Sequence, residues 1–116
     1  DWVKRGWVMI DTKKIVEFAR DELMISKNVI VNVYLEDLTE DNAHGWCVAS
    51  SDKPGFNKNE YDIELEETLN DEEMLVTLCH EMVHVRQYSQ GERSNEREAI
   101  SLENELAEKY KKFIAG

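Results

Sequence analysis

The pattern His-Glu-x-x-His at residues 80–84 constrains this chain more than any other feature of its sequence. In a helix, His80 and His84 lie on one face about one turn apart, a separation at which two imidazoles can bind one metal ion. Glu81 is rotated from that pair by about 100° and could reach a water at the metal without being a ligand. A chance occurrence is expected in on the order of a few chains per thousand of this length. The sequence therefore predicts a metal site on this helix.

The flanking residues delimit this helix. Asn70 and Glu73 have the spacing of a capping box, which predicts a helix start. Apolar residues then recur at helical spacing to about Gln90, and Gly91 is a natural residue to follow a helix end. Histidine and glutamate side chains on such an apolar helix are costly to bury unless they are paired or bind a metal.

The third protein ligand has to come from elsewhere in the chain, since a catalytic zinc site has three protein ligands and one water. No histidine follows His84, and the remaining one, His44, falls on a predicted strand. A carboxylate is therefore the expected third ligand. The last predicted helix offers four candidates: Glu96, Glu98, Glu103 and Glu105.

Helical phase separates these candidates. At about 100° per residue, Glu96 and Glu103 point roughly along the apolar stripe of the last helix. Glu98 and Glu105 point away from the centre of that stripe and are expected on a solvated face. A glutamate on the core-facing side is explained by a metal on the neighbouring helix. We expect Glu96, in the first turn, to be the ligand in preference to Glu103, with Glu98 third.

The remaining sequence predicts a single α+β domain over residues 1–116, in the order helix, three strands, helix, helix. Thr12 is the expected N-cap of the first helix, and Ser94 or Asn95 that of the last. The expected elements are an N-terminal helix at 13–26, strands at 28–35, 44–50 and 60–66 in a small mixed or antiparallel sheet, the His-Glu-x-x-His helix at 71–90 and a glutamate-bearing C-terminal helix to about 114.

Composition limits the partners of the protein. A net charge of -11 and a pI near 4.7 argue against nucleic-acid binding, which needs a basic field, and favour a positively charged peptide. Cys47 and Cys79 are too few for a disulfide framework, and we expect them as free thiols in the cytoplasm. No apolar run approaches the length of a membrane span, so no membrane partner is expected. Residues 1–10, with Trp2 and Trp7, are expected to anchor on the core or to cover the cleft.

Residues 80–84, H-E-M-V-H, and residues 95–99, N-E-R-E-A, together resemble the gluzincin pattern. Over roughly residues 28–110 the chain is similar to the minimal soluble gluzincins, or minigluzincins, and to small phage and bacterial H-E-M-V-H proteins. The resemblance implies a zinc-dependent metallopeptidase in which Glu96 is the glutamate ligand. Many gluzincins carry an aspartate four residues after that ligand. Ile100 stands there in this chain, so the contact of that aspartate is missing or comes from elsewhere.

The resemblance also implies a strand above the cleft that runs antiparallel to the substrate, and residues 60–66 could be that strand. The expected chemistry is hydrolysis of a peptide bond by a water that zinc acidifies. Glu81 takes the proton of that water and later delivers it to the leaving amine. An additional donor to the oxyanion is expected, and the sequence leaves four candidates: Tyr88, Arg97, His44 and Tyr110. Gln87, three residues after His84, could orient the histidine or lie exposed.

Two other functions fit the same residues. A zinc-binding structural or latent protein would keep the site without efficient turnover. A chain of 116 residues leaves little room for specificity pockets, and residues 1–10 could block the cleft. A regulatory protease would act on one protein, such as a repressor or a DNA-bound adduct. The acidic charge argues against the DNA-bound version.

Overall fold

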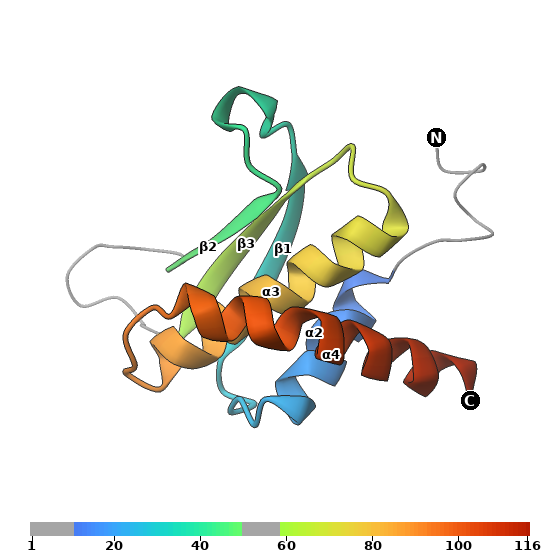
Figure 1. The fold of residues 1–116 in the computed structure, drawn as a ribbon. Helices are drawn as coiled ribbons and strands as arrows, with labels where there is room; N and C mark the ends of the chain where they lie inside the picture. Colours follow the sequence, from blue (N-terminus) through green and yellow to red (C-terminus); the bar gives the residue numbers. More distant parts are fainter. Residues whose placement is uncertain (1–10, 50–58) are drawn as a thin grey trace.

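The computed structural model describes residues 11–49 and 59–116 of the chain. It has the expected α+β class and element order (Figure 1). The elements are helix α2 (Thr12–Glu22), strand β1 (Ile30–Glu36), a short 3-10 helix η1 (Thr39–Asp41), strands β2 (Gly45–Ala49) and β3 (Glu60–Glu66), and helices α3 (Asp71–Ser89) and α4 (Glu96–Ala115). The expectations for residues 1–10, and for all but the last residue of the proline-containing loop at 51–59, fall outside the described ranges.

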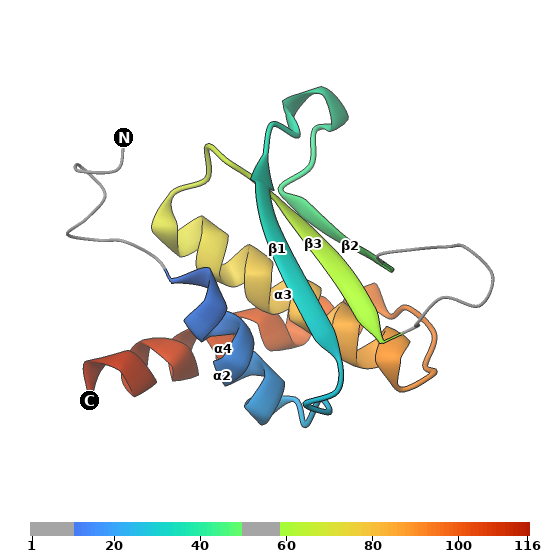
Figure 2. The same cartoon turned by 180° about the vertical axis from the view of Figure 1, so that it is seen from behind.

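The three strands form one mixed sheet in the order β1-β3-β2. β1 runs parallel to β3, and β2 runs antiparallel to it. Ile63 on β3 lies opposite Val33 on one side and Cys47 on the other. The inward-facing Tyr61, Ile63 and Leu65 are buried, as the alternation in their sequence predicted. Figures 1 and 2 show from opposite sides that the helices lie on one face of this sheet.

Helix α3 lies in the middle of the molecule. It packs against β2 and β3 on one side and against α2 and α4 on the others, with α4 on its far side from the sheet (Figures 1 and 2). Its buried apolar residues are Met74, Leu75, Leu78, Cys79, Met82, Val83 and Val85. Neighbours on several sides restrict the water that reaches α3, so each polar side chain on it needs a protein partner or a ligand.

Both ends of α3 are fixed by the residues that the sequence indicated. The Asn70 side chain accepts a bond from the Glu73 N–H at 2.8 Å, and the Glu73 carboxylate accepts one from the Asn70 N–H at 3.0 Å. This is the predicted capping box. At the other end Gly91 has a φ of +76°, and the Glu92 N–H donates to the carbonyl of Gln87 at 2.7 Å. These are the features of a Schellman motif, which ends the helix just before the segment that leads to α4.

Helix α2 differs from its prediction at both ends. The N-cap is Asp11, not Thr12, because the Asp11 side chain accepts the Lys14 N–H at 3.0 Å. The helix ends at Glu22 instead of residue 26, since Met24 adopts a φ of +58°. The N–H of Ile25 then donates to the Arg20 carbonyl at 2.9 Å. The apolar spacing suggested a longer helix, but Ile25 reaches the core only after the chain has reversed.

Strand β2 approaches α3 closely because its first residue is glycine. A Cβ atom on Gly45 would lie 2.9 Å from the Glu64 carbonyl and 3.0 Å from the Thr77 methyl group. Both distances are shorter than an ordinary van der Waals contact. Gly45 therefore allows the edge strand to rest against the helix that carries the histidines.

Met24 and Gly91 both have positive φ at a helix end, and substituting each of them tests the cost of that backbone conformation. Met24→Gly should stabilise the protein by about 1 kcal/mol, because glycine adopts positive φ without the cost of a Cβ atom. Met24 is 83% exposed, so little packing is lost. Gly91→Ala should destabilise by a similar amount through backbone strain alone, since nothing lies within 4 Å of the added Cβ. Equilibrium denaturation of both variants measures the two changes, and shifts of the same sign would contradict the assignment.

Candidate metal centre

The side chains of His80 and His84 project from one face of α3, as the spacing predicted. Their ring centroids are 5.1 Å apart, with the rings nearly perpendicular at 74°. Both Nε2 atoms face the carboxylate of Glu96, at 2.9 Å for His80 and 2.7 Å for His84. Among the residues that the structure describes, these three form a group whose ligand atoms all lie within 4.8 Å of one another. The expected ligand set is thus brought together in space.

The other nitrogen of each imidazole has a partner of its own. Nδ1 of His80 lies 2.8 Å from the carboxylate of Glu103, and Nδ1 of His84 lies 2.9 Å from Oε1 of Gln87. Both partners are acceptors, so each suits the tautomer that has its proton on Nδ1 and its lone pair on Nε2. Partners of this kind fix the orientation and tautomer of a metal-binding histidine and leave Nε2 to face the ion.

The donor set fits a zinc ion. Two imidazoles and one glutamate form a known set of protein ligands for catalytic zinc. Ligand atoms about 2.0–2.1 Å from zinc at tetrahedral corners are about 3.3 Å apart. In the structure the two nitrogens contact different oxygens of Glu96, with His80 at 2.9 Å from Oε2 and His84 at 2.7 Å from Oε1. The Glu96 side chain is 62% exposed, so its carboxylate has room to turn one oxygen toward an ion.

Four glutamates on α4 were candidates for the third ligand, and each has a distinct place. Glu96 faces the two histidines, whereas Glu103 binds the far side of His80. Glu98 accepts hydrogen bonds from Gln87, at 2.9 Å, and from Arg86. The bond from Gln87, together with Arg86, lowers the pKa of the Glu98 carboxyl against the effect of burial. Glu105 lies outside the site.

The residue at position 100 makes no contact with the site, whereas a carboxylate one turn later reaches His80. Ile100 is exposed and takes no part in the site. Glu103 follows Glu96 by two helical turns, so both residues face α3 from the same side of α4. Sequence reasoning had treated these two glutamates as competitors for one role. Their shared phase was the signal that both would reach the histidines.

Glu81 lies inside the site, with 5% of its surface exposed. Burial is the main cause of a raised pKa for its carboxyl. The neighbouring His80 and His84 lower that pKa, and Glu96 and Glu103 raise it. A carboxyl held in this way is suited to exchange protons closer to neutral pH than an ordinary glutamate.

The site opens into a cleft of about 790 Å³. Its walls come from the β2 segment, including His44 and Cys47, from α3 and from the first half of α4. Within the described strands, β2 is an edge strand that pairs with β3 alone. The expectation that residues 60–66 face the substrate is wrong, because β3 is central and both of its edges are already paired. The strand that borders the cleft and has one edge without a described partner strand is β2.

Two of the four candidate oxyanion donors line this cleft. His44 precedes β2, and Tyr88 stacks on His84 with centroids 5.9 Å apart and the rings at 17°. Tyr110 is buried in the core, where its ring meets Phe18 edge-on at 5.5 Å. Arg97 is exposed and does not line the cleft. The choice is thus reduced to a histidine next to β2 and a tyrosine on α3.

Both cysteines are free thiols, as expected. Burial raises the pKa of Cys79 to about 12, and burial together with the nearby Glu81 carboxylate raises the pKa of Cys47 to about 12. Neither thiol belongs to the group formed by His80, His84 and Glu96 among the described residues, so the candidate centre is a nitrogen and oxygen site.

Comparisons with protein families, with curated proteins and with solved structures find no match to this chain. The resemblance to the gluzincins therefore stays a prediction that rests on residues 80–84 and 95–99. None of the helices in the described ranges is long and apolar enough to cross a lipid bilayer.

The contact between Glu103 and His80 can be tested by zinc affinity. Glu103→Ala should weaken zinc binding by about 10- to 100-fold, because Nδ1 of His80 loses the acceptor that orients the ring. Glu105→Ala is the matched control, since its carboxylate meets only the exposed Lys109, at 3.7 Å. Competition with a chromogenic chelator measures both affinities. Equal affinities in the two variants would show that Glu103 does not support the metal site.

Proposed function

We propose that the protein is a zinc-dependent peptidase of the gluzincin type, with His80, His84 and Glu96 as the zinc ligands. The observation that carries this proposal is the convergence of both Nε2 atoms on the Glu96 carboxylate at 2.9 and 2.7 Å. Glu81 is buried beside them, in a cleft of about 790 Å³. Ligands, a carboxylate for proton transfer and space for a substrate are thus assembled in one place.

The chemistry divides between the ion and the chain. When bound, zinc supplies Lewis acidity, which activates water and polarises a carbonyl oxygen. Glu81 removes a proton from the attacking water as the new carbon–oxygen bond forms. The same carboxyl then passes this proton to the amine nitrogen as the carbon–nitrogen bond breaks. His44 and Tyr88 are the residues of this cleft best placed to donate a hydrogen bond to the carbonyl oxygen.

The proposed substrate is a basic peptide in extended conformation. The described residues that line the cleft include no lysine or arginine. They include five glutamates: Glu72, Glu73, Glu81, Glu96 and Glu103. A negative field of this kind attracts positively charged chains. The free edge of β2 could pair with the substrate backbone, as an added strand does at other sheet edges. We also propose a cytoplasmic location, which the two free thiols support.

The variant Glu81→Gln distinguishes the peptidase hypothesis from that of a protein that only binds zinc. Glu81→Gln should bind zinc like the wild type, since Glu81 is not a ligand, and should cleave peptides about 100- to 10,000-fold more slowly. Glu105→Gln, outside the cleft, is the matched control and should keep full activity. The assay uses a mixture of basic and neutral peptides, read by mass spectrometry with and without 1,10-phenanthroline.

Three outcomes are decisive. Cleavage at the wild-type rate in the chelator, or in Glu81→Gln, would overturn the zinc mechanism. Stoichiometric zinc without cleavage of any peptide would favour the structural or latent zinc protein. If no peptide is cleaved but a separate assay with protein substrates shows cleavage of one protein, the regulatory protease is favoured.

A further inference from the structure

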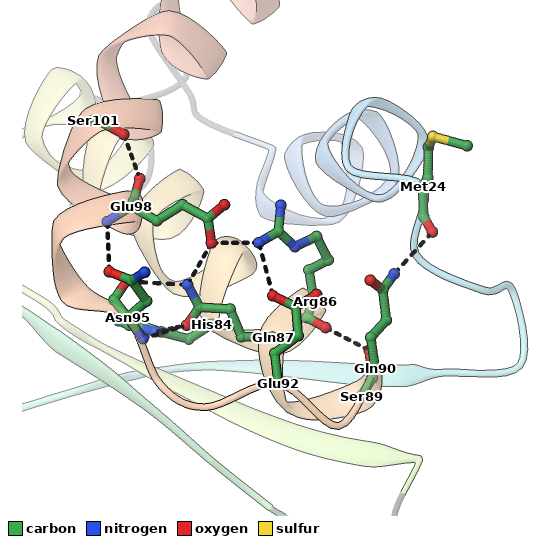
Figure 3. A network of polar contacts seen from close by, with 10 residues as sticks. All are labelled: Met24, His84, Arg86, Gln87, Ser89, Gln90, Glu92, Asn95, Glu98 and Ser101. Atoms are coloured by element: carbon green, nitrogen blue, oxygen red, sulfur yellow. Dashed lines mark hydrogen bonds and ion pairs between the residues drawn. The ribbon is translucent and has the colours of Figure 1, made fainter.

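We propose that Gln87 is a positioning residue of the metal centre, which fixes the ring of His84 and locks the start of α4 where Glu96 meets it. This role rests on the zinc site of the proposed function, but it does not require catalysis. Figure 3 shows the network in which Gln87 takes part, between the last turn of α3 and the first turn of α4.

The orientation of the Gln87 amide is fixed by four polar contacts with three residues. Its Oε1 accepts the N–H of Asn95 at 3.0 Å and lies 2.9 Å from Nδ1 of His84. Its Nε2 donates to the Asn95 carbonyl at 3.0 Å and to the Glu98 carboxylate at 2.9 Å. A flipped amide would set donor against donor at Asn95 and oxygen against oxygen at Glu98. The oxygen therefore faces His84, whose Nδ1 has to be the donor.

This bond decides which nitrogen of His84 is available to an ion. Nδ1 carries the proton that goes to Gln87, so Nε2 is the nitrogen with a lone pair for the metal. Gln87 is 0% exposed, so water cannot readily replace the amide as the acceptor. The ring is also held from its face by the stacked Tyr88. His84 is thus fixed in both tautomer and direction.

The same amide holds the segment that places the third ligand. Gln87 binds both the N–H and the C=O of Asn95, which holds the backbone of that residue against α3. Asn95 is the N-cap of α4, and its side chain accepts the Glu98 N–H at 3.0 Å. Glu96 is the next residue, so its position relative to His84 is set through Gln87. The Gln87 side chain thus links the proposed ligand Glu96 to His84.

Charged groups close the network around this amide. The Glu98 carboxylate accepts from Gln87 and also pairs with Arg86 of α3. Arg86 in turn pairs with Glu92, in the segment between the helices, at 3.3 Å. The segment between the helices is therefore bound to α3 at Glu92 and Asn95, and the first turn of α4 is bound to α3 at Glu98 (Figure 3). The buried Gln87 amide uses both of its donors and both of its acceptor positions, so removing it leaves several groups unpaired.

Replacing Gln87 with a methionine, in Gln87→Met, tests the positioning role of Gln87 with little change in the shape of the side chain. Gln87→Met should weaken zinc binding by about 10- to 100-fold, the usual effect of losing a partner that orients a ligand. Gln90→Met is the matched control, because Gln90 is exposed and donates only to the Met24 carbonyl, at 3.3 Å. Chelator competition gives the affinities, and circular dichroism checks that both variants are folded.

A spectroscopic signature distinguishes positioning from general support of the fold. Zinc-loaded wild type should show two slowly exchanging imidazole Nδ1–H protons by NMR, one from His80 and one from His84. Gln87→Met should lose the His84 signal and keep that of His80, which remains bonded to Glu103. Retention of both signals in Gln87→Met would overturn the proposal.

Exchanging two side chains provides a rescue. In the double variant Gln87→Glu with Glu98→Gln, a carboxylate at 87 still accepts from His84, and the amide at 98 donates to it, but the bond to the Asn95 carbonyl is lost. The His84 Nδ1–H signal should therefore be present, and zinc should bind more tightly than to Gln87→Met. This variant also decides the matter if Gln87→Met does not fold. Absence of the His84 signal in a folded, zinc-loaded double variant would overturn the role of Gln87.

The zinc and activity measurements keep this proposal separate from the peptidase. Equal zinc affinity in wild type and Gln87→Met would remove the positioning role and leave the peptidase standing. Weaker binding in Gln87→Met, with no peptide cleaved by wild type, would support the positioning role and remove the peptidase. Wild type that binds no zinc would overturn both proposals.

Discussion

The contact between the Glu96 carboxylate and the two imidazoles is the interaction on which the site depends. It joins the middle of α3 to the first turn of α4 through contacts of 2.9 and 2.7 Å. The capping box at Asn70 starts α3, and the Schellman motif at Gly91 ends it. Because α3 ends soon after His84, the chain reverses and brings the first turn of α4 to the histidines. The site therefore follows from where two helices begin and end.

Polar groups on α3 would destabilise a purely structural helix. Glu81, His84 and Gln87 are all buried on a helix whose other faces pack against the sheet and against α2 and α4. Each carries a cost of burial that a leucine would avoid. His84 and Gln87 offset that cost through hydrogen bonds to each other, but Glu81 keeps a raised pKa, mainly through burial. A carboxyl kept in such surroundings favours a chemical role over a structural one.

The parts of the site that sequence could predict are those that local geometry determines. Helical spacing was enough to place His80 with His84, and helical phase was enough to bring Glu96 toward them. Phase could not separate the candidate ligand Glu96 from Glu103, because both lie on one stripe and only the depth of helix packing distinguishes them. Strand order is equally non-local. Alternation predicted residues 60–66 as a strand but carries no signal that β3 pairs on both edges.

Charge connects the candidate metal centre to the packing of the two helices. Glu81, Glu96 and Glu103 line one cleft, and carboxylates held close together in a partly buried site repel each other. A divalent cation among the ligands offsets this repulsion, and an ion that binds only the folded chain stabilises it in proportion to its affinity. Because the ligands come from α3 and α4, that stabilisation acts at the junction between them. An ion bound by these three residues would therefore couple metal binding to the docking of α4 on α3.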